Sequence, residues 1–196
     1  MSIEQPARPP VRPSDRPLRP GVFLDRDGTI IGDPGYLRDP EQVELFPGAG
    51  AAIARLNAAD RPVIVVTNQS GISRGKVSEQ EYRDVAARLD DLLAPFGARI
   101  DATYVCPHAP ERDGPCACRK PGLELFQRAA ADQRLDLAAT WWVGDRLSDL
   151  LPAASLGGKG VLVETGEGTA HRAASLDQGF AVASGLGTAV DRILSG

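Results

Sequence analysis

Two aspartates separated by one residue, Asp25 and Asp27, directly follow a short apolar run at residues 21–24. That run is typical of a buried β-strand. Carboxylates at positions i and i+2 of an extended segment point to the same side, where like charges repel unless a cation or proton lies between them. The pair therefore indicates a divalent metal and a phosphoryl substrate. A solvated Asp-Gly turn is the alternative, and the motif alone does not decide between them.

A second group of chemically active side chains contains all three cysteines, which lie between positions 106 and 118 in a Cys-x-His, seven residues, Cys-x-Cys pattern. Three thiolates and one imidazole suit tetrahedral Zn²⁺ and leave no position for water. We therefore expect structural zinc, which would order a loop with little to bury, at Cys106, His108, Cys116 and Cys118. Catalytic zinc and three free thiols beside a satisfied histidine are alternatives. A nucleic-acid-binding knuckle is another, but the loop offers little for stacking on bases.

Apolar runs that position these groups alternate with helical patterns along the chain. Strands are expected at residues 22–24, 63–66, 102–105, 141–143 and 161–163, with a weaker candidate at 180–183. Helices are expected at residues 49–59, 78–93, 123–132 and 188–194, the second of them opened by a capping box at Ser78. This alternation predicts an α/β fold, a three-layer sandwich whose mostly parallel sheet is covered on both faces.

Three of the expected strands end in polar residues: the first in Asp25, the second in Thr67 and Asn68, the fourth in Gly144 and Asp145. Ligands of such sheets bind outside the carboxyl ends of the strands. The convergence of three polar ends at one edge favours a common site over three separate turns.

Composition limits the classes of partner. The chain has 196 residues, 42% hydrophobic and 24% charged, with a net charge of −4. That length fits one domain, and the acidic balance argues against nucleic-acid and anionic-membrane partners. No apolar run approaches the roughly 18 residues of a membrane span.

The first twenty residues differ from the rest, since they hold six prolines and four arginines. They lack the apolar core of a signal peptide, so we expect a disordered tail at residues 1–20, one domain at residues 21–196, and a cytoplasmic protein. Docking of the tail to a partner is the alternative.

From about residue 21 to residue 163 the chain resembles the haloacid-dehalogenase-like phosphohydrolase superfamily. Four motifs carry the resemblance, in order: Asp25-Arg26-Asp27-Gly28-Thr29, Thr67-Asn68, Lys120, and the stretch from Gly144 to Asp149. The resemblance implies a Rossmann-like fold and hydrolysis through an aspartyl-phosphate, with Asp25 as nucleophile and Asp27 as general acid and base. It also implies Mg²⁺ held by Asp25, the backbone carbonyl of Asp27, and Asp145.

The same resemblance assigns the remaining motif residues. Thr67 and Asn68 would donate to the phosphoryl oxygens, and Lys120 would neutralise charge there. Asp149 would hold metal-bound water or Lys120. Alternatively, Asp149 is an acid favoured at a helix start, and Lys120 is a surface lysine.

Within the superfamily, the zinc loop followed by Arg119-Lys120-Pro121 is similar to that of D-glycero-D-manno-heptose 1,7-bisphosphate 7-phosphatases and of histidinol-phosphate phosphatases. The Ser-Gly-Ile-x-Arg-Gly segment at residues 70–75 favours the heptose group. The resemblance to the heptose group implies a small sugar bisphosphate as the substrate and a role in heptose-nucleotide biosynthesis. A second phosphate calls for cations at the rim, and Arg119 and Arg74 are the candidates, unless they are merely solvated.

The remaining expectations concern the surroundings of the site. Only a short loop follows the first strand, and the zinc loop occupies the other customary cap position, so we expect a minimal cap and an open site. We also expect a monomer. The segment at residues 166–171, with His171, is expected to be a surface loop. A non-catalytic phosphate-binding module is the alternative from another class, although such a module needs no nucleophile.

Overall fold

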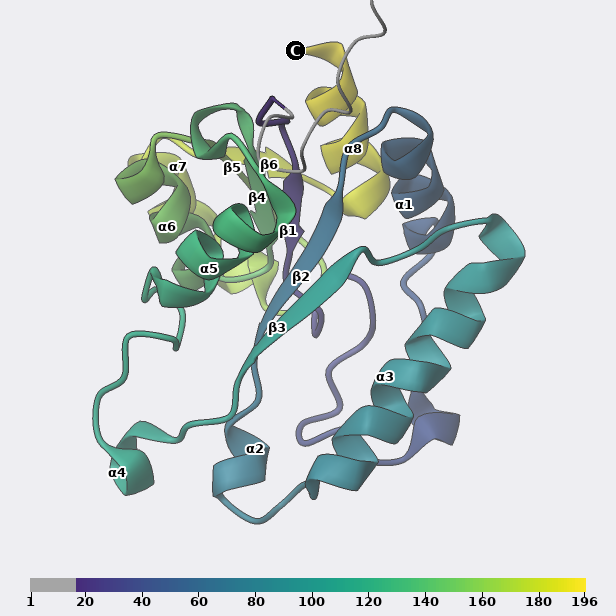
Figure 1. The fold of residues 1–196 in the computed structure, drawn as a ribbon, viewed down its shortest axis with the longest axis vertical. Helices are drawn as coiled ribbons and strands as arrows, with labels where there is room; N and C mark the ends of the chain where they lie inside the picture. The colour runs from purple at the N-terminus through teal and green to yellow at the C-terminus, as the bar shows by residue number, and fades with distance from the viewer. Residues whose placement is uncertain (1–16) are drawn as a thin grey trace, which may run out of the picture.

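The computed structural model describes residues 17–196, and a six-stranded sheet lies at its centre (Figure 1). Its strands are β1 (Val22–Leu24), β2 (Val63–Asn68), β3 (Ala102–Cys106), β4 (Trp141–Gly144), β5 (Lys159–Val163) and β6 (Ala181–Ala183). They are arranged in the order β3-β2-β1-β4-β5-β6, and every neighbouring pair is parallel. The predicted strands, including the weak sixth candidate, are thus confirmed.

The sheet grows in opposite directions from β1. Phe23 of β1 is in register with Ile64 of β2 on one side and with Trp142 of β4 on the other. The crevice where the strand order reverses is where sheets of this kind bind ligands. The residues that follow β1, β2 and β4 therefore lie at the edge where such sheets bind ligands.

Helices other than the short α2 and α4 cover both faces of the sheet. The helices are α1 (Ala49–Ala58), α2 (Ser70–Ser73), α3 (Glu79–Leu93), α4 (Pro110–Asp113), α5 (Glu124–Gln133), α6 (Leu147–Leu156), α7 (Gly168–Asp177) and α8 (Leu186–Ser195). In Figure 1, α1, α3 and α8 lie to the right of the sheet, and α5, α6 and α7 lie to the left. The short α2 and α4 lie beyond the carboxyl ends of β2 and β3. The predicted three-layer architecture is confirmed.

Alternate residues of β1 build the two halves of the core. Val22 and Leu24 pack into the cluster that contains α1 and α8, whereas Phe23 packs with Phe126 and Trp142 on the other face. The ring centroids of Phe23 lie 5.0 Å from Phe126 and 4.9 Å from Trp142. A strand buried on both faces reads as a continuous apolar run, which is why β1 was recognisable despite its short length.

Helix α3 begins as its sequence predicts. The hydroxyl of Ser78 accepts the backbone N–H of Glu81, and the Glu81 carboxylate accepts the backbone N–H of Ser78. This reciprocal capping box satisfies two donors that would otherwise lack partners at the helix start.

The longer helices α6 and α7 and the short α2 and α4 were not predicted. Pro152 lies inside α6, where a proline removes a backbone donor and obscures the helical pattern. The expected surface loop at residues 166–171 is wrong in its second half, because α7 begins at Gly168 and includes His171. Likewise, residues 110–113 of the expected zinc loop form the single turn α4.

The bulk of the expected N-terminal tail lies outside the described residues. Arg19, assigned to that tail, forms a bridge with Leu135, and its carbonyl accepts the backbone N–H of Asp136 at 2.9 Å. The folded part of the chain thus includes this residue.

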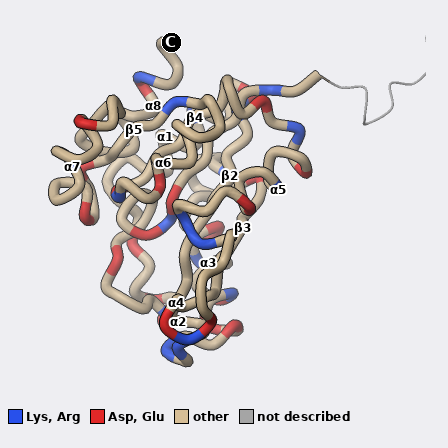
Figure 2. The backbone as a smooth tube through the Cα atoms, turned by 90° about the vertical axis from the view of Figure 1, so that its left-hand side faces the viewer, with Lys and Arg blue, Asp and Glu red and all other residues tan. Residues whose placement is uncertain are grey.

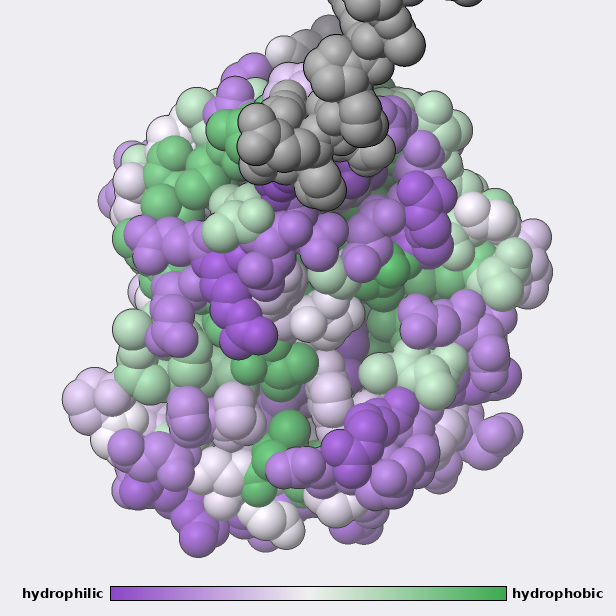
Figure 3. Space-filling model, in the orientation of Figure 1, coloured by the Kyte–Doolittle hydropathy of each residue, from purple (hydrophilic) through white to green (hydrophobic). Residues whose placement is uncertain are grey.

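The surface of the described part is predominantly polar. On the face shown in Figure 3, hydrophilic side chains predominate and apolar ones form small patches. On the side shown in Figure 2, acidic and basic positions are interspersed. No helix among residues 17–196 has the length and apolar character to cross a membrane.

Candidate active site

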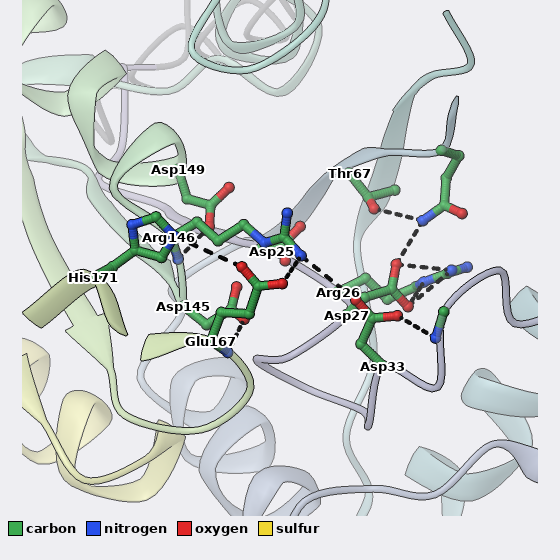
Figure 4. Close-up of polar contacts among 12 residues, drawn as sticks. Asp25, Arg26, Asp27, Asp33, Thr67, Asp145, Arg146, Asp149, Glu167 and His171 are labelled. Atoms are coloured by element: carbon green, nitrogen blue, oxygen red, sulfur yellow. Dashed lines mark hydrogen bonds and ion pairs between the residues drawn. The ribbon is translucent and has the colours of Figure 1, made fainter. Parts of the chain in front are cut away.

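A pocket of about 500 Å³ opens at the carboxyl ends of β1 and β2. The predicted residues that line it are Asp25, Asp27, Thr67, Asn68, Arg74, Arg119, Lys120 and Asp149. Asp145 lies beside it, since its carboxylate falls within 4.8 Å of those of Asp25 and Asp149. Sequence positions more than a hundred residues apart are thus brought together (Figure 4).

Lys120 is the central cation of this pocket. Its ammonium group is buried and contacts carboxylate oxygens of Asp25 at 2.6 Å and Asp149 at 2.8 Å. It also donates to the backbone carbonyl of Val66 at 2.7 Å. Burial opposes its charge, but Asp149 and Asp25 outweigh burial and hold the pKa of Lys120 above its ordinary value.

Asp149 serves Lys120 and the helix start together. One carboxylate oxygen pairs with Lys120, and the other accepts the backbone N–H of Arg146 at 2.9 Å, at the beginning of α6. The two roles that the sequence left as alternatives are therefore combined in one side chain.

Asp25 lies directly after β1, and its backbone N–H donates to the Val143 carbonyl of β4 at 2.9 Å. Burial raises the pKa of this carboxyl to about 8, although Lys120 acts in the opposite direction. Nearby Asp149, Asp27 and Asp145 raise it further. A carboxyl in such surroundings gains from an additional cation, since a cation favours its ionised form.

Asp27 is held from two sides. The guanidinium of Arg26 donates to both of its carboxylate oxygens at 3.0 Å, and Gln69 donates to one of them at 2.6 Å. Gln69 also donates to the hydroxyl of buried Thr67 at 2.9 Å. Arg26 and Gln69 were not predicted as site residues, because only the folded chain shows what they contact.

Asn68 holds the lysine segment. Its side-chain oxygen accepts the backbone N–H of Lys120 at 3.0 Å, and its amide nitrogen lies 3.4 Å from the Lys120 carbonyl. The contacts of its side chain are therefore with the backbone at position 120, whereas the expected role was donation to substrate.

Asp145 has the surroundings of a metal ligand. One carboxylate oxygen accepts the Glu167 backbone N–H at 2.8 Å, while the other is buried with no hydrogen-bond partner among residues 17–196. A Cβ atom at Gly28 would lie 2.1 Å from Asp145, so only glycine fits there. Burial raises the pKa of Asp145 to about 6. Hard carboxylate oxygens without a full set of partners suit Mg²⁺.

Residues after β5 adjoin this side of the pocket through Arg146, which lines it, and Gly166 and Glu167 remain exposed as the sequence predicts. The Arg146 guanidinium lies 2.7 Å from Glu167 and 3.7 Å from Asp33, so it joins two loops (Figure 4). His171 lies 3.8 Å from the same glutamate. No local motif marks these residues, whose role comes from the packing of α7 against the strand ends.

The four predicted zinc ligands lie together beside the pocket. The thiols of Cys106, Cys116 and Cys118 are separated by 3.1–3.7 Å, and the Nδ1 atom of His108 is 3.1 Å from Cys118. Tetrahedral Zn²⁺ with bonds near 2.3 Å needs sulfur separations of about 3.8 Å, close to those present. Burial raises the pKa values of Cys106 and Cys118, so a metal would have to displace their protons.

The two rim arginines differ in how they are held. Arg119 donates to the backbone carbonyl of His108 at 3.3 Å. Arg74 donates to Glu111 at 2.5 Å and to the Tyr36 hydroxyl at 2.6 Å. The charge of Arg74 is therefore already matched by a carboxylate, so Arg119 is the better candidate for a second phosphate.

Two family models match the chain. One, described as haloacid dehalogenase-like hydrolase, matches residues 22–96, and the other, described as HAD-hydrolase-like, matches residues 117–189. The matched segments contain the motif residues at the ends of β1, β2 and β4. Fold and site together define a haloacid-dehalogenase-like hydrolase.

Comparison with curated relatives identifies a family among the haloacid-dehalogenase-like hydrolases. The chain is 42% identical over 152 residues to the D-glycero-beta-D-manno-heptose-1,7-bisphosphate 7-phosphatase of Haemophilus ducreyi, covering 74% of this chain and 84% of that protein. It is 37% identical to the enzyme of the same name from Bordetella bronchiseptica, covering 88% and 97%. The chain belongs to the family of these phosphatases.

A solved structure agrees with this assignment. The crystal structure of D,D-heptose 1,7-bisphosphate phosphatase from B. bronchiseptica, complexed with magnesium and phosphate, matches with a TM-score of 0.83 at 36% identity. The match covers 90% of this chain and 98% of that one. The enzyme of the same name from Burkholderia thailandensis matches with a TM-score of 0.71 at 34% identity, covering 91% and 100%.

Proposed function

We propose that this protein removes the C7 phosphate of D-glycero-D-manno-heptose 1,7-bisphosphate in a Mg²⁺-dependent reaction of heptose-nucleotide biosynthesis. The observation that carries the proposal is the group of Asp25, Asp27, Lys120 and Asp145 at one pocket, in a chain 42% identical to a phosphatase of that name. A phosphatase without a large lid suits a small sugar phosphate.

The reaction proceeds in two steps. A carboxylate oxygen of Asp25 attacks phosphorus, and the bond to the sugar oxygen breaks as Asp27 donates a proton to that oxygen. Water then attacks the aspartyl-phosphate, Asp27 takes a proton from the water, and phosphate leaves with Asp25 restored. Lys120, which already contacts Asp25, neutralises charge on the phosphoryl oxygens.

Asp25, the backbone carbonyl of Asp27, and Asp145 would hold Mg²⁺. The unpartnered buried oxygen of Asp145 supports this assignment, as does the elevated pKa of Asp25. The ion, when bound, neutralises charge on the transferring phosphoryl group. Thr67 lies within the same pocket as a hydroxyl donor.

The cysteine and histidine cluster would hold structural zinc. Cys118 lies two residues before Lys120, so a metal that fixes the position of Cys118 would also restrict the position of Lys120. The monomeric state and the cytoplasmic location stay predictions.

A substrate panel tests the proposal. With Mg²⁺ present, release of phosphate is measured from heptose 1,7-bisphosphate, histidinol phosphate and nucleotide phosphates. We expect the heptose bisphosphate to have the highest kcat/KM. Asp25→Asn should abolish release, whereas Asp177→Asn, at an exposed position at the end of α7, should not. A preference for histidinol phosphate would contradict the substrate assignment. The absence of turnover on every ester by correctly folded protein would contradict the proposal that this protein is a phosphatase.

Arg119 allows a sharper test of the bisphosphate. Arg119→Ala should raise KM for the bisphosphate more than for heptose 7-phosphate, because only the first carries a second dianion. Steady-state kinetics with both esters measures the difference. Equal effects on the two would remove Arg119 from this role.

A further inference from the structure

Arg26 is an unusual residue for the floor of a pocket. It is only 2% exposed, and Asp27 is the one carboxylate with which it forms an ion pair among residues 17–196. Neighbouring residues of an extended chain point to opposite sides, so this pair can form only because the chain turns here. The burial of a charge is costly unless it is paired and hydrogen-bonded. The fork on Asp27 pairs the charge through Nε and Nη2, whereas Nη1 is buried with no hydrogen-bond partner among residues 17–196.

The backbone, not the guanidinium, shapes the turn. The Arg26 carbonyl accepts the N–H groups of Ile30 at 2.9 Å and Ile31 at 3.1 Å. The side chain is therefore available for another role, and among residues 17–196 its hydrogen bonds run to the Asp27 carboxylate alone.

Tyr82 of helix α3 contacts the Arg26 guanidinium. The Cζ atom of Arg26 lies 5.3 Å from the ring centroid of Tyr82, within the range of a cation–π contact. Gln69, which directly follows β2, donates to the Asp27 carboxylate at 2.6 Å. Asp27 is thus held by a cation in the turn after β1, which contacts Tyr82 of α3, and by an amide just beyond β2.

We propose that Arg26 is a positioning residue that fixes the Asp27 carboxyl for proton transfer, with Tyr82 as its support. This inference rests on the proposed function, in which Asp27 protonates the departing sugar oxygen. In this proposal Arg26 acts through Asp27, because its side chain is only 3% exposed and two of its nitrogens donate to that carboxylate.

Esters with different leaving groups can test whether Arg26 positions Asp27 for proton transfer. A sugar oxygen must be protonated as it departs, whereas p-nitrophenolate leaves as a stable anion and needs no proton. Loss of positioning at Asp27 should therefore slow the sugar ester and spare the aryl ester. A role confined to folding would slow both equally.

The experiment compares Arg26→Met with wild type on heptose 1,7-bisphosphate and p-nitrophenyl phosphate. We expect kcat for the sugar ester to fall about 10–100-fold, part of what a general acid contributes, with less than about a threefold change for the aryl ester. KM for both should change little. Equal loss on the two esters, or a raised KM with unchanged kcat, would overturn the proposal.

Two further variants keep the test decisive. Arg26→Lys retains the buried charge without the fork, so it should fold even if the methionine variant does not, and it should show the same selective loss. Arg99→Met is the matched control, because Arg99 also donates to an aspartate at 3.0 Å but is exposed and distant from the pocket. It should leave the ratio of the two activities unchanged.

A crystal structure of the Arg26→Lys variant separates this proposal from the proposed function. If the wild type hydrolyses neither ester, the function fails, yet the position of the Asp27 carboxyl still tests Arg26. We expect that carboxyl to adopt a second rotamer in the variant. An unchanged carboxyl position would overturn the positioning role.

Discussion

The ammonium group of Lys120 lies between two carboxylates and a carbonyl, with its side chain only 3% exposed. Such a triad stabilises the fold only while it is complete, because removal of one partner leaves charges buried without compensation. Asp25, the proposed nucleophile, provides one of those carboxylates. Stability and catalysis therefore depend on the same contact.

Lys120→Met should abolish activity and lower the free energy of unfolding by roughly 3 kcal/mol, the cost of breaking a buried ion pair. Urea unfolding without added Mg²⁺ measures the loss, and added Mg²⁺ should restore part of it at Asp25. A chelator is avoided because it would also remove zinc. An unfolding free energy equal to that of wild type would contradict this account of the triad.

The acidic cluster makes metal binding depend on pH. Burial raises the pKa values of Asp25 to about 8 and Asp145 to about 6, both above the ordinary 3.8. The metal-free folded state thus binds more protons than the unfolded state, and these groups reduce stability as pH rises through this window. Mg²⁺ favours the ionised carboxylates and opposes that loss.

The rise in Tm caused by Mg²⁺ should therefore be larger at about pH 8 than at about pH 5.5. Thermal unfolding with and without Mg²⁺ across this range measures it. Asp145→Asn should show a smaller rise at the higher pH. A rise that is independent of pH in the wild type would exclude these carboxylates as the ligands.

At the scale of elements, the segment from β3 to α5 connects two sites. Cys106 ends β3, Cys118 follows a loop with the short α4, and Lys120 enters the pocket two residues later. The Cys106 carbonyl also accepts the backbone N–H of Gln69 at 2.7 Å. Disorder in this loop would displace both the lysine and the amide that contacts Asp27.

His108→Gln should lose zinc and most of the activity even with excess Mg²⁺, because the loss is one of order at Lys120. Metal analysis together with phosphate release measures both effects. The other histidine of the chain offers the control, since His171→Gln in α7 should keep its zinc. Full activity of a zinc-free protein would remove the coupling.

The elements also explain what the sequence can and cannot predict. Asp25 and Asp145 were recognisable because each directly follows an apolar strand, so a local pattern marks it. Arg26 and Gln69 were not, because their role exists only once the turn after β1 and the end of β2 bring both side chains to the Asp27 carboxylate. Helix α6 was not recognisable because Pro152 interrupts its helical sequence pattern. Residues 166–168 adjoin the site because Gly166 lies against Gly28 in the folded chain. Such contacts leave no periodic signal.

At the scale of the whole molecule, one described chain supplies every group that the proposed reaction uses. Acid, nucleophile, lysine and metal ligands all lie at the carboxyl edge of a single sheet. A second copy is not needed to complete the pocket.

Activity per chain should therefore stay constant when the protein is diluted from micromolar to nanomolar concentration. Phosphate release across a dilution series measures this, with sedimentation at the higher concentration to determine the mass relative to 20.7 kDa. A fall in specific activity on dilution would show that an assembly is required.

The neighbouring positions of β1 and β4 in the sheet have a consequence for how the protein is made. Asp25 donates its backbone N–H to Val143, and its carboxylate meets a lysine 95 residues further along the chain. During synthesis from the N-terminus, Asp25, the proposed nucleophile, leaves the ribosome long before Lys120 and Asp145 have been added to the chain. A nascent chain shorter than about 150 residues lacks some of the proposed site residues. The protein can therefore become active only late in translation.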